Sequence, residues 1–432
     1  FPVLTIVVTQ LAGVELAGMF SLAFVTGSLL MILANYGVRT YQISDLDEAH
    51  SFSDYQLNRW LTCAAMLVVG WIYCAIRGYA DEMFTISMGV YVYKMVDGLA
   101  DVYEGRLQQK DKLYLAGISQ AFRSVLVLAV FSIALFVTRS VSVSCIAMAV
   151  AAGISFIVLT LPLAIWETPT SARASFDSVI ALFKQCAPLF VALFLYSLID
   201  NMPKFVMEGV LSYDNQLYYN VLYFPAMGIL LTAQLIYKPM LVKMAAVWAD
   251  PEKRKRFDMI IVVIVAVIVG ITVVMALIMG WVGITIMSFL YGVDFEQFRG
   301  LVFIMLAAGG VTACIDFLYQ VVTVLRQQRT VTKLYLITFG FSLFVPILLV
   351  NFTGLPGAII GYLIVMCILL VLLVWEYGKV RMALAERDKQ AAAAHATRVV
   401  GRVVPTEDAP AERQRRSRDA SAELRTSRTP RR

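Results

Sequence analysis

Histidine is almost absent from this sequence: the 432 residues include two, His50 in a polar segment and His395 near the C-terminal end. A histidine base or a histidine-bound metal inside an apolar segment is therefore excluded. The six cysteines lie in or beside apolar segments and form no Cys-x-x-Cys pair. We expect them to be small buried hydrophobic residues rather than disulfides or metal ligands. No secretory signal peptide is visible, and we expect no cofactor.

Charged residues are also scarce, at 15% of the chain, whereas hydrophobic residues make up 60% and the mean hydropathy is +0.76. A soluble domain is nearer 45–50% apolar. The excess lies in long, nearly uncharged runs such as 358–375 and 257–291, the second of which we expect to be broken near Gly280. Runs of this length are typical of membrane-spanning helices. The sequence therefore predicts an all-α polytopic membrane protein.

The apolar runs and the charged breaks between them predict twelve helices. They are expected at 1–10, 17–37, 60–80, 83–104, 115–138, 142–166, 186–208, 216–237, 258–291, 299–325, 331–351 and 355–377. The first run is too short to span a membrane, so we expect this helix to be truncated at its start.

The twelve helices divide into two bundles of six. We assign 1–166 to the N-terminal bundle, 167–185 to a cytoplasmic linker and 186–382 to the C-terminal bundle. Two similar halves around a central cavity are a common plan of transporters that alternate access between the two sides of a membrane. Residues 383–432 are rich in Ala and Arg and hold few large apolar side chains, so we expect a disordered cytoplasmic tail.

The distribution of Lys and Arg predicts the orientation. One alternating set of loops carries sixteen of these residues and the other carries four, namely Arg77, Arg139, Lys204 and Arg299. Basic loops stay on the cytoplasmic side, so we expect both termini in the cytoplasm. The basic runs 251–256 and 413–418 fit contact with anionic membrane lipids, and we expect no nucleic-acid partner.

A charged stripe interrupts the fourth expected helix. Five polar residues lie within an arc of roughly 80° if the segment is helical. They are Lys94, Asp97, Asp101, Glu104 and Gln108. A charge at the bilayer centre costs about 2.5–3.5 kcal/mol on insertion scales, so the stripe must face protein or water. Two interpretations stay open: Lys94 pairs with a neighbouring Asp, while Glu104 marks the membrane boundary, or Lys94, Asp97 and Asp101 line a hydrated cavity.

Other ionisable residues recur inside apolar segments. Arg123 lies about a third of the way into the fifth expected helix, and its guanidinium cannot lose a proton to become neutral. The seventh helix places Asp200 and Lys204 on one face, with Asn201 adjacent, and the tenth carries Asp316. For Asp200 and Asp316, a hydrogen bond between helices that only stabilises the bundle is an equal alternative.

Two segments resemble a known family. The opening "FPVLTIVVTQLAGVELAGMFSLAF…ANYGVRTYQ", with Gly37-Val38-Arg39 where the second helix ends, and "YKPML" at 237–241 resemble Wzx-type polysaccharide flippases. These belong to the multidrug/oligosaccharidyl-lipid/polysaccharide exporter superfamily, and the resemblance covers roughly residues 1–380. It implies a non-enzymatic carrier in the bacterial cytoplasmic membrane that moves an undecaprenyl-pyrophosphate-linked oligosaccharide for surface polysaccharide biosynthesis. Glycosyltransferases and a polysaccharide polymerase are the implied protein partners.

A pyrophosphate headgroup would account for cations inside the bundle. Arg offers two parallel hydrogen bonds to a phosphate and Lys a mobile point charge, while neighbouring carboxylates hold these cations in place and give a route for coupling to protons or sodium. The candidate cavity residues are Arg39, Lys94, Asp97, Asp101, Arg123, Asp200, Asn201, Lys204 and Asp316.

Other functions remain as alternatives. A proton- or sodium-coupled drug antiporter of the same superfamily would need an acid-dominated cavity, whereas Lys94, Arg123 and Lys204 favour an anion. A lipid II flippase usually has fourteen helices. A membrane O-antigen polymerase or glycosyltransferase needs a large outward loop or a DxD motif with a soluble catalytic domain, and a channel needs a filter motif; the sequence shows none of these.

Overall fold

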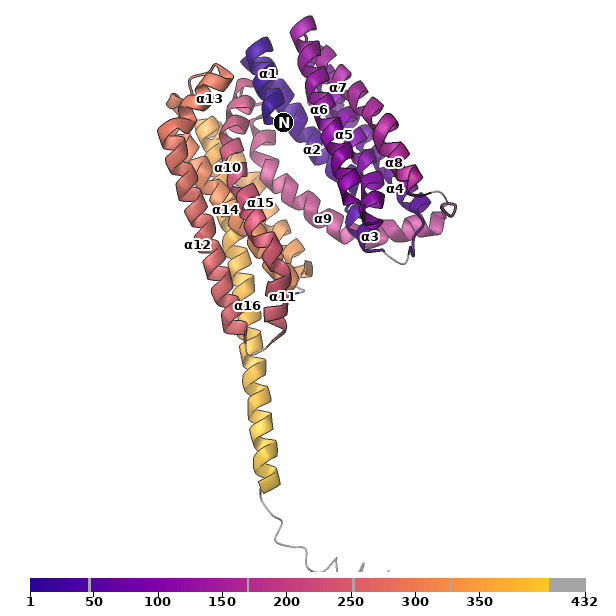
Figure 1. Ribbon diagram of the computed structural model, residues 1–432. Helices are drawn as coiled ribbons and strands as arrows, with labels where there is room; N and C mark the ends of the chain where they lie inside the picture. The colour runs from indigo at the N-terminus through magenta and orange to yellow at the C-terminus, as the bar shows by residue number, and fades with distance from the viewer. Residues whose placement is uncertain (46–47, 169–170, 251–252, 326–327, 404–432) are drawn as a thin grey trace, which may run out of the picture. The chain divides into compact units, whose positions relative to one another are not determined.

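The computed structural model describes residues 1–45, 48–168, 171–250, 253–325 and 328–403, and nearly all of them are helical (Figure 1). The N-terminal half contains α1 (Pro2–Ala12), α2 (Val14–Asn35), α3 (Val38–Ser44), α4 (Phe52–Arg77), α5 (Asp81–Gln109), α6 (Leu113–Thr138), α7 (Val141–Ser155) and α8 (Leu161–Trp166). The C-terminal half contains α9 (Phe176–Met207), α10 (Asp214–Tyr237), α11 (Leu241–Ala249), α12 (Arg254–Ile278), α13 (Ile284–Tyr291), α14 (Arg299–Val324), α15 (Gln328–Thr353) and α16 (Leu355–Val403).

The helices confirm the predicted fold class. Within the described ranges, ten segments are long and apolar enough to cross a membrane. The eleven-residue α1 and the charged, 29-residue α5 complete the twelve expected helices among these residues. The predicted break near Gly280 is also present, because a π-helical turn at Met279–Gly283 separates α12 from α13.

Large apolar side chains cover much of the outer surface of these helices. Trp281 is 89% exposed, and Phe289 and Trp166 are each 83% exposed. Exposed apolar area on this scale is not stable in water and indicates contact with lipid.

Helix α2 joins the two halves. It packs against α4 and α5 of its own half and against α9 and α10 of the other. At Gly18 in α2, a β-carbon would collide with the backbone oxygen of Tyr213, so glycine allows the two halves to approach closely here. Residues 1–374 form one compact unit, and a second unit begins at Trp375.

Two helices extend beyond their expected bounds. Helix α9 begins at Phe176, inside the predicted linker 167–185, because Val179, Leu182 and Cys186 recur at helical spacing and are buried. Helix α16 extends past its expected end at residue 377 to Val403, into the predicted tail 383–432. This part of the sequence contains four consecutive alanines, and alanine has the highest helix propensity of all residues. Residues 404–432 of that tail lie outside the described residues.

Glu48 connects the segment before α4 to the end of α5. Its carboxylate lies 2.7 Å from Lys110 Nζ and 3.0 Å from Arg106 Nη1. Hydrogen bonds from Lys110 and then from Arg106 lower the pKa of the Glu48 carboxyl. A lowered folded-state pKa means that these bonds stabilise the protein above the ordinary Glu pKa and are lost as the pH falls through the lowered value.

We therefore expect Glu48→Gln to lower the free energy of unfolding by at most about 1 kcal/mol at pH 7, since the Glu48 and Lys110 side chains are 41% and 40% exposed. The difference from the wild type should disappear under acid conditions, where Glu48 is protonated in both states. Thermal melts of the detergent-purified protein across pH test this expectation, and a pH-independent difference contradicts it.

Candidate functional site

The charged stripe of α5 faces protein. Its carboxylates meet arginines from α3, α4 and α6, and the ion pairs form a continuous group that we call the α5 cluster. Its members are Arg39, Arg59, Lys94, Asp97, Asp101, Glu104 and Arg123. The stripe thus pairs with side chains of neighbouring helices and does not face lipid. These ion pairs lower the free energy that placing charges in the bilayer requires.

Asp101 joins two arginines from different helices. Its Oδ1 lies 2.7 Å from Arg39 Nη1 and its Oδ2 lies 2.8 Å from Arg59 Nη2. Arg59 is fully buried and also donates to the backbone oxygen of Ala34, at 2.9 Å, and to Asn35 Oδ1, at 2.7 Å. Arg59 therefore ties α4 to the end of α2 and orients Asp101 on α5.

The turn before α3 sets the direction of Arg39. Gly37 has φ +70° and lies against the side chain of Leu189 in α9, and both the dihedral and the contact disfavour a side chain at this position. The turn lets α3 start directly after α2, so that Arg39 reaches Asp101 and donates to Gln108 Oε1 at 3.0 Å. The Gly37-Val38-Arg39 motif therefore serves to bring Arg39 onto α5.

Arg123 is enclosed by carboxylates. Its Nε lies 2.9 Å from Asp97 Oδ1 and its Nη2 lies 2.8 Å from Glu104 Oε1, and its side chain is 3% exposed. A third hydrogen bond, of 3.3 Å, reaches Thr160 Oγ1 in the π-helical turn Phe156–Thr160. The structure thus places this predicted cavity residue inside the N-terminal half, where it holds α5, α6 and the end of α7 together.

Lys94 has looser contacts. Its ammonium lies 3.8 Å from Asp97 Oδ2, a carboxylate that Arg123 already binds, and 4.3 Å from the ring centre of Phe24. The ring of Phe24 stacks on Phe1, which in turn meets the edge of Phe224 in α10. Lys94 therefore lies near the boundary between the two halves.

The cluster carries an excess of one positive charge, because four cations face three carboxylates. Arg39 and Lys94 are its accessible cations, with side chains 31% and 12% exposed, whereas Arg59 and Arg123 are buried. An anion can therefore reach the cluster at two points without displacing a buried arginine.

Two members of the cluster were missed as site residues. Arg59 directly precedes the expected helix 60–80, which predicts a loop position, although Asn58, Thr62 and Met66 are buried beside it at helical spacing. Glu104 is the last residue of the expected helix 83–104, a position that indicates the membrane boundary, but α5 continues to Gln109. The sequence signal for Arg59 is the apolar pair Cys63 and Met66, four and seven residues later, which places Arg59 on the same helical face.

The C-terminal half surrounds its charges with tyrosines. Asp200 accepts a hydrogen bond of 2.7 Å from the Tyr362 hydroxyl and one of 3.3 Å from Tyr223. Lys204 is buried, donates to Asn201 Oδ1 at 2.9 Å, and lies 4.7 Å from the ring centre of Tyr223. The predicted trio of Asp200, Asn201 and Lys204 is thus brought together by hydrogen bonds and ring contacts.

Asp316 is held from α10. Gln234 Nε2 donates to its Oδ2 at 2.9 Å, and the hydroxyl of Tyr237 donates to the same oxygen. One turn before Asp316, Thr312 lies 3.2 Å from the Tyr362 hydroxyl that also binds Asp200. Tyr362 therefore links Asp200 to Thr312 on α14, one helical turn from Asp316, and these hydrogen bonds do not reach the α5 cluster.

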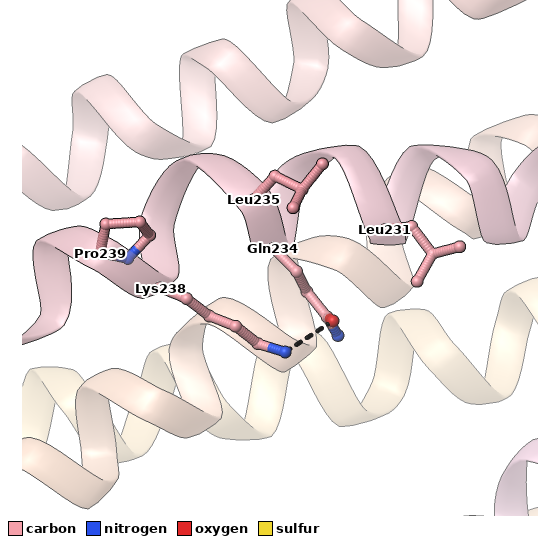
Figure 2. A pocket seen from close by; sticks show the side chains of 5 residues that line it. All are labelled: Leu231, Gln234, Leu235, Lys238 and Pro239. Carbon is pink, nitrogen blue, oxygen red and sulfur yellow. Dashed lines mark hydrogen bonds between the residues drawn. The ribbon is translucent and has the colours of Figure 1, made fainter. Parts of the chain in front are cut away.

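The end of α10 carries the "YKPML" segment. Figure 2 shows Gln234 and Lys238 pointing toward each other, joined by a hydrogen bond of 2.8 Å from Lys238 Nζ to Gln234 Oε1. The surrounding cavity has a volume of about 350 Å³ and is otherwise lined by Leu231, Leu235 and Pro239. Since Leu235 is 79% exposed, this is a shallow, mainly apolar surface cavity.

Two further cavities lie between α9, α14 and α15. The first, of about 160 Å³, is lined by Ala192, Leu193, Tyr196, Ile315, Asp316, Tyr319 and Tyr335. The second, of about 220 Å³, is lined by Tyr41, Pro188, Leu189, Ala192, Tyr319, Val331 and Thr332. They share Ala192 and Tyr319, and Tyr41 of α3 brings the N-terminal half into the lining.

Glu208 connects the halves where α4 and α9 end. Three side chains donate to its carboxylate, which is almost fully buried. They are Tyr73 at 2.6 Å, Arg77 at 2.7 Å and Tyr79 at 2.5 Å. Arg77 also donates to the backbone oxygen of Glu208 at 2.7 Å. We call this group the Glu208 contact; no local pattern predicts it, because Glu208 is the last residue of the expected helix 186–208 and its partners lie 129–135 residues earlier in the chain.

Comparisons with known proteins support a transporter fold. No protein-family model and no curated protein matches the sequence. A multidrug resistance MATE family transporter of the MOP superfamily, in an inward-facing conformation, superposes with a TM-score of 0.61 at 13% identity, over 89% of this chain and 94% of that chain. The MATE transporter VcmN of Vibrio cholerae superposes at 0.58 and 14% identity, over 88% of this chain and 92% of that chain.

The lipid II flippase MurJ, in an inward closed conformation, superposes with a TM-score of 0.65 at 12% identity, over 87% of this chain and 84% of that chain. At these identities the likeness concerns the fold, and most of each chain takes part in it. The chain is a multi-pass membrane protein with the fold that these MATE transporters and the lipid II flippase share.

Proposed function

We propose that the protein is a flippase that moves an undecaprenyl-pyrophosphate-linked oligosaccharide across the bacterial cytoplasmic membrane for surface polysaccharide biosynthesis. One observation carries this proposal: the α5 cluster has an excess of one positive charge inside the bundle, with Arg39 and Lys94 as its accessible cations. A diphosphate that leaves water needs such groups, because they replace its lost hydration with charge-assisted hydrogen bonds.

Within this proposal, the residues of the cluster have two roles. Arg39 and Lys94 contact the diphosphate, Arg39 through its planar fork and Lys94 as a mobile point charge. Arg59 and Arg123 are positioning residues, because they are buried and fix the carboxylates that hold the other two. No covalent step is required, so the protein acts as a carrier and not as an enzyme.

The Glu208 contact supports movement by alternating access. The distribution of Lys and Arg predicts that α4 and α9 end at the outer face, so the contact closes the halves on that side. Substrate then enters from the cytoplasmic side, and its release outward requires the contact to break. Protons or sodium ions are the coupling ions that this class of mechanism would use.

A second candidate function is a drug antiporter of the same superfamily. It is favoured by the C-terminal half, where Asp200 and Asp316 lie among tyrosines whose ring faces attract organic cations. The excess positive charge of the α5 cluster opposes it, because a cation in the N-terminal half would be repelled.

A reconstituted flipping assay tests the two candidates. We expect the wild-type protein in liposomes, with a proton or sodium gradient, to flip a fluorescent polyprenyl diphosphate, and Lys94→Ala to slow this flipping at least about tenfold because the mobile cation is lost. Bleaching of the outer-leaflet fluorophore by dithionite measures the rate. Lys253→Ala is the matched control, since Lys253 forms an exposed pair with Asp250 three residues away.

Transport of ethidium in place of the polyprenyl diphosphate would favour the antiporter. Equal flipping rates for the wild type and Lys94→Ala would remove Lys94 from the site.

A further inference from the structure

The two cavities between α9, α14 and α15 differ in chemistry from the α5 cluster. We call them together the tyrosine cavity, because four tyrosines line them: Tyr41, Tyr196, Tyr319 and Tyr335. Asp316 is the charged residue in the lining, and no lysine or arginine is present among the described lining residues. A diphosphate would meet no cation among these lining residues, so this space is suited to another part of the substrate.

The tyrosine rings suit a hydroxylated ligand that has an apolar face of C–H groups. The Tyr335 ring centre lies 5.5 Å from that of Tyr196 and 6.3 Å from that of Tyr319. The rings of Tyr319 and Tyr335 are 25° from parallel. A tyrosine presents an apolar face for C–H groups and a hydroxyl that both donates and accepts hydrogen bonds. Pockets with aromatic walls and a few polar groups are the common form of small-molecule sites.

Asp316 supplies a fixed acceptor. Gln234 and Tyr237 both donate to Oδ2 of Asp316. Among the described residues, no donor is hydrogen-bonded to Oδ1. A carboxylate only accepts, and sugar hydroxyls donate, so Oδ1 can take a substrate hydroxyl without breaking an existing bond. The volumes of about 160 Å³ and 220 Å³ together reach the lower part of the 300–1,000 Å³ range of ligand pockets.

The cavity also lies close to an accessible cation. Arg39 and Tyr41 are two residues apart on α3 and therefore project from nearly opposite sides of it. Arg39 reaches α5, whereas the Tyr41 hydroxyl donates to the backbone oxygen of Gln185 in α9 at 2.8 Å. Arg39 and Tyr41 thus place the α5 cluster and the tyrosine cavity on two sides of the same seven-residue helix.

We propose that the tyrosine cavity binds the pyranose ring next to the diphosphate, with Tyr319 as the stacking surface and Asp316 Oδ1 as an acceptor for its hydroxyls. This inference rests on the proposed function, because it assigns the sugar of the same lipid-linked substrate to the C-terminal half. The diphosphate remains with Arg39 and Lys94, so the two chemical parts of the substrate contact different halves.

A comparison of two lipids tests this assignment. The probes are undecaprenyl diphosphate and the same lipid carrying one N-acetylglucosamine, bound to the full-length protein in detergent and measured by native mass spectrometry. We expect the wild type to bind the glycosylated lipid five- to tenfold more tightly. Tyr319→Leu should abolish that gain while changing the affinity for the bare lipid less than twofold.

Two further variants complete the design. Tyr114→Leu removes a tyrosine that is 64% exposed on α6 and should retain the full gain. Tyr319→Phe keeps the ring and removes the hydroxyl, so it should keep part of the gain, and it serves as the test if the leucine variant fails to fold.

The outcomes separate the two proposals. A wild type that binds both lipids equally, or a Tyr319→Leu variant that loses affinity for both lipids equally, overturns the sugar assignment and leaves the proposed function standing. A wild type that binds neither lipid but binds tetraphenylphosphonium overturns the proposed function and the sugar assignment with it.

Discussion

Glu208→Gln is expected to shift the protein toward a state in which the halves separate at the end where α4 and α9 meet. The substitution keeps the size of the side chain and removes the charge that Tyr73, Arg77 and Tyr79 bind. Hydrogen bonds to a charged group are worth about 1.5–3 kcal/mol each. Glutamine still accepts hydrogen bonds through its carbonyl oxygen, so only part of this energy is lost. A net loss of about 2 kcal/mol corresponds to a shift of about thirtyfold in the equilibrium between the closed and the separated state.

Distance measurements between the halves test this expectation. Spin labels at Val137, at the end of α6, and at Phe289, in α13, are suitable because these side chains are 73% and 83% exposed and lie outside the Glu208 contact. Cys367, which is exposed, is first replaced by Ser, whereas the other described cysteines are buried. Pulsed electron paramagnetic resonance should show a longer distance component in Glu208→Gln.

Arg299→Ala is the matched control for this experiment. Arg299 pairs with Glu296 three residues away, both side chains are about half exposed, and the pair does not connect the two halves. The distance distribution of this variant should equal that of the wild type. An unchanged distribution in Glu208→Gln as well would show that the packing of α2 against α10, including Gly18 against Tyr213, keeps this end closed without the carboxylate.

The contrast between the α5 cluster and the Glu208 contact shows what this sequence can predict. The stripe on α5 is a local pattern, since its members recur within a few helical turns, and periodicity alone predicts that they share a face. Its partners are not local. Arg39, Arg59 and Arg123 come from three other helices, and only the packing of α3, α4 and α6 around α5 decides which carboxylate each one meets.

The Glu208 contact had no local signal at all. Glu208 follows α9, and its partners lie 129–135 residues earlier in the chain. The tyrosine cavity is similar, because Tyr319 and Tyr335 belong to different helices and their meeting depends on how α14 and α15 pack. Helix count and membrane class follow from hydropathy, whereas contacts between distant helices follow from packing.

Arg123→Ala and Lys94→Ala should affect different properties of the protein. Without Arg123, the carboxylate of Glu104, whose side chain is 3% exposed, loses its closest cation and Asp97 loses its shorter ion pair. Removing one partner of a buried ion pair costs about 3–5 kcal/mol, because the other charge stays buried. We therefore expect Arg123→Ala to lower the melting temperature and the yield of folded protein.

Lys94→Ala should leave the melting temperature close to that of the wild type while it slows flipping. Asp97 keeps its ion pair with Arg123 at 2.9 Å, so no carboxylate is left without a cation. Fluorescence-detected size exclusion after heating measures stability, and the liposome assay measures transport.

The double variant Arg123→Ala/Glu104→Gln should recover part of the stability lost in Arg123→Ala, because the carboxylate that lost its cation is also removed. If Arg123→Ala instead folds as well as the wild type and only transport is lost, the prediction is wrong. Arg123 would then contact the substrate directly, in a state in which its side chain is more exposed than it is here.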